Sequence, residues 1–293
     1  MTRPLRAALL AAALLASTPS RAAVPWETTP LPGSLPSPAA EGRVSVPGAS
    51  LHYAAFGAGE PVLLLHGGAG NSGHWAFQIP ALARRFRVIV VDARGHGRST
   101  RDDRPLGYHL MAEDLLAVMD ALKLAQASIV GWSDGGIVGI DLAVHHPDRV
   151  KALVAFGANY DRSGLRKGGG SSATFAAYLR RCEADHRRLS PSPNGFPPLL
   201  SALGAMWRSE PAFTHAQLAG IRARTFVLDG EHDEIIRPDH ARSLAALVPG
   251  ARVQFIPQAS HFAHWQRPEA FNEAVLGFLD GAEVGVSPGG ESR

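Results

Sequence analysis

The chain has neither disulfide cross-links nor long apolar segments. Its 293 residues include one cysteine, Cys182, so an intramolecular disulfide is impossible and the fold must be stabilised by its core. No neighbour in the sequence would activate the Cys182 thiol, and we expect it to be inert. The apolar run at residues 7–16 is ten residues long, whereas a helix that crosses a bilayer needs roughly 20. We therefore expect no stable membrane anchor.

An excess of charge is also absent once the N-terminus is set aside. The formal net charge is +3, and residues 1–22 contain three arginines and no acid. The rest of the chain is therefore neutral and has no basic patch, so we expect no nucleic-acid partner.

Metal-binding motifs are missing as well. None of the 13 histidines belongs to an H-E-x-x-H motif or a comparable ligand spacing, and His145 and His146 stand at the end of an expected helix. We expect no metal and no cofactor.

The N-terminus has the layout of a secretory signal peptide. Arg3 and Arg6 precede the apolar run 7–16, and the small residues Ser20 and Ala22 follow it. We expect cleavage after Ala22 and export to the periplasm or the medium. The alternative, an uncleaved anchor, is disfavoured because the apolar run is short.

The remainder alternates strands with helices. The expected strands are 43–46, 51–56, 61–65, 87–91, 127–132, 150–156, 225–228 and 253–256, and the expected helices are 75–86, 108–124, 135–145, 239–247 and 268–279. This alternation predicts an α/β fold with a mostly parallel central sheet and helices on both faces.

Glycines and prolines interrupt the alternation at 160–220, between short helix-like pieces. We interpret this interval as a helical cap inserted between two parts of one domain. The expected organisation is a signal peptide 1–22, a proline-rich leader 23–42, a core in two parts at 43–159 and 221–281 around the cap 160–220, and a flexible tail 282–293.

The motif G-x-S-x-G occurs at residues 131–135, between an expected strand and an expected helix. A nucleophile on such a strained turn needs neighbours without Cβ atoms, which Gly131 and Gly135 supply. We predict that Ser133 is the nucleophile. The alternative is an ordinary turn serine.

A glycine-rich turn follows the expected strand 61–65. In His66–Gly67–Gly68–Ala69–Gly70 the backbone can approach a substrate oxygen, and we predict that the Gly68 and Asp134 N–H groups form an oxyanion hole. A phosphate-binding loop is disfavoured because the P-loop lysine and the G-x-G-x-x-G spacing are absent.

A histidine and an acid follow the last two expected strands. His261 comes after 253–256, and open α/β sheets place their sites in loops at the carboxyl ends of strands. His264 is the competing histidine, but it lies nearer the next helix. We predict that His261 is the general base.

The acid is chosen from four candidates after the strand 225–228, namely Asp229, Glu231, Asp233 and Glu234. Asp233 is favoured by its distance from the strand end and by the following Ile235 and Ile236, which can anchor the loop.

The order Ser133, Asp233, His261 resembles that of the α/β-hydrolase family over residues 43–280, as does the turn Asp-Ala-Arg-Gly-His-Gly-Arg-Ser at 92–99. Residues 131–136 and 157–159 resemble the valacyclovir-hydrolase-like group, and 66–68 is similar to the turn of enol-lactonases and carbon–carbon bond hydrolases. The resemblance implies an α/β-hydrolase fold and a serine hydrolase that cleaves small carboxylic esters or related acyl compounds through an acyl-enzyme.

Other functions stay open at this point. They are an enol-lactonase or carbon–carbon bond hydrolase, an aminopeptidase-like hydrolase, and a ligand-binding receptor with a vestigial triad. The sequence leaves the natural substrate and the oligomeric state undetermined.

Asp134, Trp132 and Asn159 are candidate substrate-binding residues. The Asp134 side chain either caps the helix that begins at the elbow or faces the pocket and pairs with a cationic substrate group. In the valacyclovir-hydrolase-like group the matching acid holds the amino group of an amino-acid ester.

Overall fold

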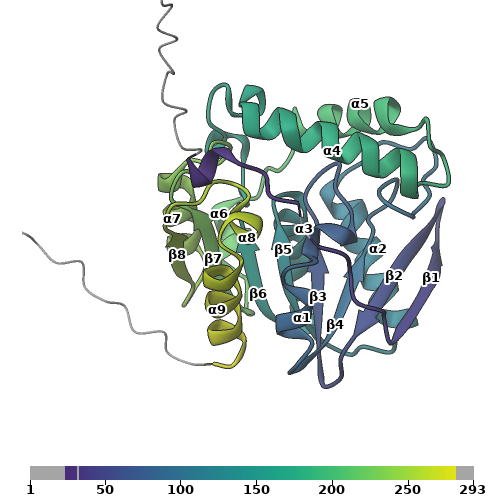
Figure 1. The fold of residues 1–293 in the computed structure, drawn as a ribbon. Helices are drawn as coiled ribbons and strands as arrows, with labels where there is room; N and C mark the ends of the chain where they lie inside the picture. Colours follow the sequence, from purple (N-terminus) through teal and green to yellow (C-terminus); the bar gives the residue numbers. More distant parts are fainter. Residues whose placement is uncertain (1–23, 32, 282–293) are drawn as a thin grey trace, which may run out of the picture.

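The computed structural model describes residues 24–31 and 33–281, and the expected signal peptide and tail lie outside these ranges. Eight strands form one sheet in the order β1-β2-β4-β3-β5-β6-β7-β8 (Figure 1). The strands are β1 Ala40–Val46, β2 Ala49–Phe56, β3 Glu60–Leu65, β4 Phe86–Val91, β5 Ala127–Trp132, β6 Val150–Phe156, β7 Arg224–Gly230 and β8 Arg252–Ile256.

The sheet is parallel from β4 to β8, whereas β2 pairs antiparallel with both β1 and β4. Its central strands are buried on both faces. Leu64 of β3, for example, pairs with Val90 of β4 and Val130 of β5, and all three side chains are fully buried. The continuous apolar runs thus form the buried parallel strands that the sequence predicts.

Five helices cover the two faces of the sheet. They are α1 Ile79–Leu82, α2 Tyr108–Ala121, α3 Asp134–His145, α7 Pro238–Leu247 and α9 Pro268–Leu279. From β3 the chain moves to β4 on one side, and from β4 it returns past β3 to β5 on the other side. Because both crossovers are right-handed, α1 lies on one face of the sheet and α2, α3 and α7 lie on the other. α9 packs beside α1, in front of the sheet in Figure 1.

The helix expected over 75–86 is wrong in length. A 3₁₀ turn at Ser72–Trp75 is followed by α1, which has only four residues. Pro80 has no backbone N–H, which is tolerated in the first turn of a helix but not in its interior. Because Pro80 lies in the first turn of α1, a helix that begins at Trp75 cannot run through it.

Three helices stand between β6 and β7, namely α4 Ala173–Leu189, α5 Phe196–Trp207 and α6 His215–Ala219. α4 and α5 lie across the top of the sheet in Figure 1. α4 is 17 residues long, although the sequence predicts only short pieces here, and the Ser172 side chain caps its N-terminus by accepting from the Phe175 N–H. Cys182 is buried in α4, and burial raises the pKa of its thiol.

Several short elements complete the fold: 3₁₀ helices at η1 Pro25–Glu27, η2 Ser72–Trp75, η3 Pro147–Arg149, η4 Arg162–Gly164 and η5 Gly169–Ser171, and the helix α8 Ala263–Gln266. Within the described ranges, no helix combines the length and the apolar character that crossing a membrane requires.

The proline-rich leader lies against the domain. The Arg181 guanidinium in α4 donates to the carbonyl oxygens of Thr29 (2.5 Å) and Pro30 (3.0 Å). The Gln266 side chain in α8 donates to the carbonyl oxygen of Thr28 at 2.7 Å. The leader therefore connects the cap to the segment that follows β8.

Candidate active site

Ser133 lies on a strained turn between β5 and α3. Its backbone has φ 54° and ψ −119°, a conformation that residues with side chains rarely adopt. A Cβ atom at Gly131 would come within 2.2 Å of the Gly135 carbonyl oxygen, and one at Gly135 within 2.3 Å of the Leu65 carbonyl oxygen. The two glycines of the motif are thus required by backbone contacts.

His261 and Asp233 meet at the same edge of the sheet. The Nδ1 atom of His261 lies 2.7 Å from Oδ2 of Asp233, and both side chains are buried. The other Asp233 oxygen, Oδ1, accepts the N–H groups of Ile235 and Ile236 at 2.6 and 2.7 Å. These bonds fix the carboxylate so that it orients the imidazole.

Burial and charge oppose each other in this pair. Burial alone would lower the pKa of His261, but the charge and hydrogen bond of Asp233, together with the charges of Glu234 and Asp134, outweigh it, and the pKa is raised. Burial likewise raises the pKa of Asp233, but the nearby His261 and other donors lower it below its ordinary value.

The competing acids occupy other positions. Glu234 accepts the backbone N–H of His261 at 3.1 Å, and Glu231 accepts the N–H of Gln258. Asp229 is buried at the end of β7, where burial and the charge of Asp233 raise its pKa well above the ordinary range. Of the four acids considered, Asp233 is the one hydrogen-bonded to the His261 ring.

The competing histidine, His264, lies in α8 and is fully buried among aromatic rings, including Trp132 and Trp75. Neither of its ring nitrogens has a hydrogen-bond partner among the described residues, and burial lowers its pKa well below 6.5. His264 is therefore a packing residue.

Ser133 and His261 line one cavity of about 350 Å³. The cap contributes Tyr178 of α4 and Trp207 of α5 to its wall. A volume of this size suits a small molecule.

The glycine-rich turn forms another wall of the cavity. Gly67 and Gly68 line it, and a Cβ atom at Gly67 would lie 3.3 Å from the Ser133 Cβ. The Ala69 N–H donates to Nε2 of His96 at 3.1 Å, so that N–H is already used. Asp134 contributes the first N–H of α3, a position with no intrahelical acceptor.

Two buried histidines hold this turn against residues 92–99. Nε2 of His66 accepts the Ala93 N–H at 3.1 Å, and Nε2 of His96 accepts that of Ala69. Burial lowers the pKa of both rings, that of His96 to about 3, so both are neutral acceptors. The turn 92–99 thus supports the glycine-rich turn.

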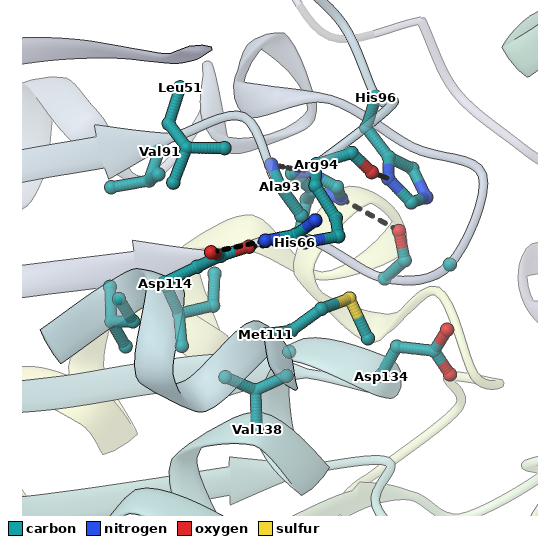
Figure 2. Close-up of a pocket in the computed structure, with 15 residues that line it drawn as sticks. Leu51, His66, Val91, Ala93, Arg94, His96, Met111, Asp114, Asp134 and Val138 are labelled. Carbon is teal, nitrogen blue, oxygen red and sulfur yellow. Dashed lines mark hydrogen bonds and ion pairs between the residues drawn. The ribbon is translucent and has the colours of Figure 1, made fainter. Parts of the chain in front are cut away.

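A second cavity, of about 40 Å³, shares Gly67, Gly68 and Asp134 with the first. Figure 2 shows the Arg94 guanidinium reaching across it to Asp114, with two N···O distances of 2.6 Å. The rest of its lining is mainly apolar, and its volume holds no more than about one to three water molecules. His66 and His96 in its lining are the residues that hold the glycine-rich turn against residues 92–99.

The hydrogen bonds of the Asp134 carboxylate run to side chains outside α3 rather than to N–H groups of its first turn, although an acid at this position still suits the positive end of the helix dipole. The carboxylate faces the main cavity and accepts the Tyr108 hydroxyl at 2.9 Å and the Trp207 indole N–H at 2.9 Å. Burial raises the pKa of Asp134 to about 6, and the two donors only partly oppose this shift. Asp134 is therefore ionised in most molecules at neutral pH.

Trp132 and Asn159 also line the cavity. The Trp132 indole is fully buried and donates to the carbonyl oxygen of His261 at 2.9 Å, which fixes the histidine loop. Asn159 donates to the carbonyl oxygen of Asp161 at 2.8 Å.

Sequence reasoning missed Tyr108, Trp207 and Glu210, which line the same cavity. Tyr108 begins α2, Trp207 ends α5 and Glu210 follows α5, so no motif joins them to the elbow. The only feature of the sequence that indicates Trp207 is its type: it is an aromatic residue with a hydrogen-bond donor, within the expected cap.

The sequence model of the alpha/beta hydrolase fold family matches residues 60–191. A relative in Caulobacter vibrioides, provisionally named carbamate hydrolase RutD, is 34% identical over 262 residues, 79% of this chain and 96% of that protein. The chain belongs to the α/β-hydrolase fold family.

Two further members of this family match nearly the same extent. Mouse serine hydrolase BPHL is 29% identical over 250 residues, which cover 81% of this chain and 85% of that protein. The enol-lactonase of Burkholderia xenovorans LB400 superposes with a TM-score of 0.66 and 26% identity, over 82% of this chain and all of that one. Each of these two matches covers about four fifths of this chain.

Proposed function

We propose that this α/β-hydrolase is a serine hydrolase that cleaves carboxylic esters or related acyl compounds. The observation that carries the proposal is the strained Ser133 elbow in one cavity with His261, whose ring is hydrogen-bonded to Asp233. A nucleophile, a base and a group that orients the base are the elements that acyl transfer requires.

The proposed reaction proceeds in two halves. Ser133 Oγ attacks the acyl carbon while Nε2 of His261 takes its proton, and Asp233 stabilises the imidazolium. The N–H groups of Gly68 and Asp134 bind the developing oxyanion. His261 then protonates the leaving group, and a water activated by the same ring hydrolyses the acyl-enzyme.

The substrate class is argued from the cavity and the relatives. A volume of about 350 Å³ fits a small acyl compound. The names of two relatives, a carbamate hydrolase and an enol-lactonase, both describe hydrolysis at an acyl carbon. An enol-lactonase is therefore the second candidate, favoured by that structural likeness.

The test compares a panel of short-chain nitrophenyl esters and lactones in wild type and Ser133→Ala. We expect the variant to lose several orders of magnitude in kcat, with about 10³–10⁴-fold over water remaining from the oxyanion hole and binding. Ser45→Ala, at an exposed position in β1, is the matched control and should keep full activity. A Ser133→Ala protein that is correctly folded and retains most of its activity would exclude Ser133 as the nucleophile.

A further inference from the structure

Outside the catalytic cavity, α2 and α3 bring together two histidines and an aspartate. Nδ1 of His109, in the first turn of α2, lies 2.9 Å from Oδ1 of Asp141. Nδ1 of His145, one turn after Asp141 on α3, lies 3.1 Å from the same oxygen. One ligand atom from each of the three residues lies within 4.8 Å of the others. The two helices lie side by side in Figure 1.

The burial of the three side chains differs in a way that suits a bound cation. The Asp141 side chain is 6% exposed, and every residue of α3 from Asp134 to Ala143 is buried. The side chains of His109 and His145 are 59% and 37% exposed. A buried carboxylate is stabilised by a positive partner, and a cation bound between the three side chains would supply that charge.

We propose that His109, Asp141 and His145 bind one divalent transition-metal ion of the zinc class. Zinc ligands at about 2.0–2.1 Å in a tetrahedron stand about 3.3 Å from one another, close to the 2.9 and 3.1 Å that separate the histidine nitrogens from the carboxylate oxygen. Two imidazoles and one carboxylate leave a fourth position for water. Magnesium and calcium prefer oxygen ligands, so this set discriminates against them.

The proton balance of binding is simple. In a neutral imidazole the Nδ1 proton moves to Nε2, which frees the Nδ1 lone pair for the ion. The exposure of both rings lets Nε2 bond to water in that tautomer. The ion takes the place of the two hydrogen bonds to the Asp141 carboxylate and of the bond from His145 Nδ1 to the Asp141 carbonyl oxygen at 3.0 Å.

This proposal replaces the expectation of no metal. The Asp-x-x-x-His spacing on α3 supplies two ligands one helical turn apart, but the third comes from 32 residues earlier, on another helix. Bound there, the ion would join the first turn of α2 to α3. His109 directly follows Tyr108, which donates to Asp134, so the ion would also steady a wall of the catalytic cavity.

The test titrates tag-free, chelator-treated protein with Zn²⁺, Co²⁺ and Mg²⁺ by calorimetry. We expect one Zn²⁺ or Co²⁺ per chain, a visible Co²⁺ absorption band and no Mg²⁺ binding. Loss of a residue that only hydrogen-bonds to a metal ligand lowers metal affinity roughly 10–100-fold. His109→Ala and His145→Ala should each lower the Zn²⁺ affinity by more than this, because each removes a ligand. His215→Ala, which removes a surface histidine of α6, should leave the affinity unchanged.

Thermal unfolding supplies a second readout. Because only the folded chain presents the three ligands together, excess Zn²⁺ should raise the unfolding temperature of wild type and His215→Ala, but not of the two ligand variants. The proposal is overturned if wild type shows no saturable Zn²⁺ binding. It is equally overturned if binding keeps its affinity in both His109→Ala and His145→Ala, because the ion then sits at other residues such as His261.

Discussion

The carboxylate of Asp134 is the least expected group beside the proposed nucleophile. It is buried, and it faces the cavity with Tyr108 and Trp207 as donors. A negative charge near a developing oxyanion is unfavourable unless it serves recognition, because like charges in a desolvated site repel. A substrate ammonium group would pair with it and remove that cost.

We therefore expect wild type to prefer an α-amino ester over its des-amino analogue, and Asp134→Asn to lose the preference. The ratio of the two kcat/KM values is the measurement. The pKa of Asp134 is about 6, so the ratio should fall as the pH falls through 6 and the carboxylate is neutralised. Taking a ratio cancels the loss of both rates that protonation of His261 causes as the pH falls.

Glu210→Gln is the matched control, because Glu210 is the other carboxylate that lines the cavity and it accepts the Tyr108 N–H at 2.8 Å. The variant should keep the preference for the amino ester. Equal ratios in wild type and Asp134→Asn, or a preference lost only in Glu210→Gln, would contradict the role given to Asp134.

At the scale of elements, the leader, α8 and the histidine loop are linked through one side chain. Gln266 of α8 donates to the Thr28 carbonyl oxygen of the leader, and its Oε1 accepts the Ser260 N–H at 2.7 Å. Ser260 directly precedes His261, so this side chain joins the leader to the loop of the proposed base.

We predict that Gln266→Ala lowers both stability and kcat. The lost hydrogen bonds leave partly buried groups unpaired, which costs about 1–3 kcal/mol, and the His261 loop loses an anchor. Urea unfolding and ester hydrolysis measure the two effects. The control Gln254→Ala removes a glutamine of β8 and should change neither the stability nor kcat. An unchanged kcat in Gln266→Ala would show that the contact with the leader does not affect catalysis.

Elements with a strong local pattern could be predicted from the sequence. β5, β6 and α9 have the predicted bounds, because a buried apolar run or a 3.6-residue period sets each of them locally. α1 and α8 could not be predicted, since each is a single turn held by packing. α4 escaped prediction because glycines precede it at 168–170 and prolines follow it at 191 and 193, which favours short pieces over one long helix.

The same distinction applies to the candidate site. Ser133, Asp233 and His261 each follow a strand, so the topology of a parallel sheet predicts that they converge. Tyr108 and Trp207 reach Asp134 from α2 and the cap, and only the tertiary packing brings them together. His109 escaped notice as a metal ligand for the same reason.

At the scale of the whole molecule, export is a prediction that rests on the sequence of residues 1–22, with cleavage after Ala22. Thr28 and Thr29 of the leader lie beyond that position and accept hydrogen bonds from α8 and α4. Cleavage there would leave the leader intact. We propose export, and we expect protein from an exporting host to have the intact mass of a chain that starts at Ala23. A chain that keeps residues 1–22 would contradict it.

The central claim is that Ser133 is an activated nucleophile in a cavity shared with His261. Incubation with a fluorophosphonate probe, followed by intact-mass measurement and peptide mapping, tests it most directly. We predict one covalent adduct per chain, located on Ser133, which is absent in Ser133→Ala and strongly slowed in His261→Ala. A folded wild-type protein that takes up no probe, or that carries it on another serine, would contradict the claim.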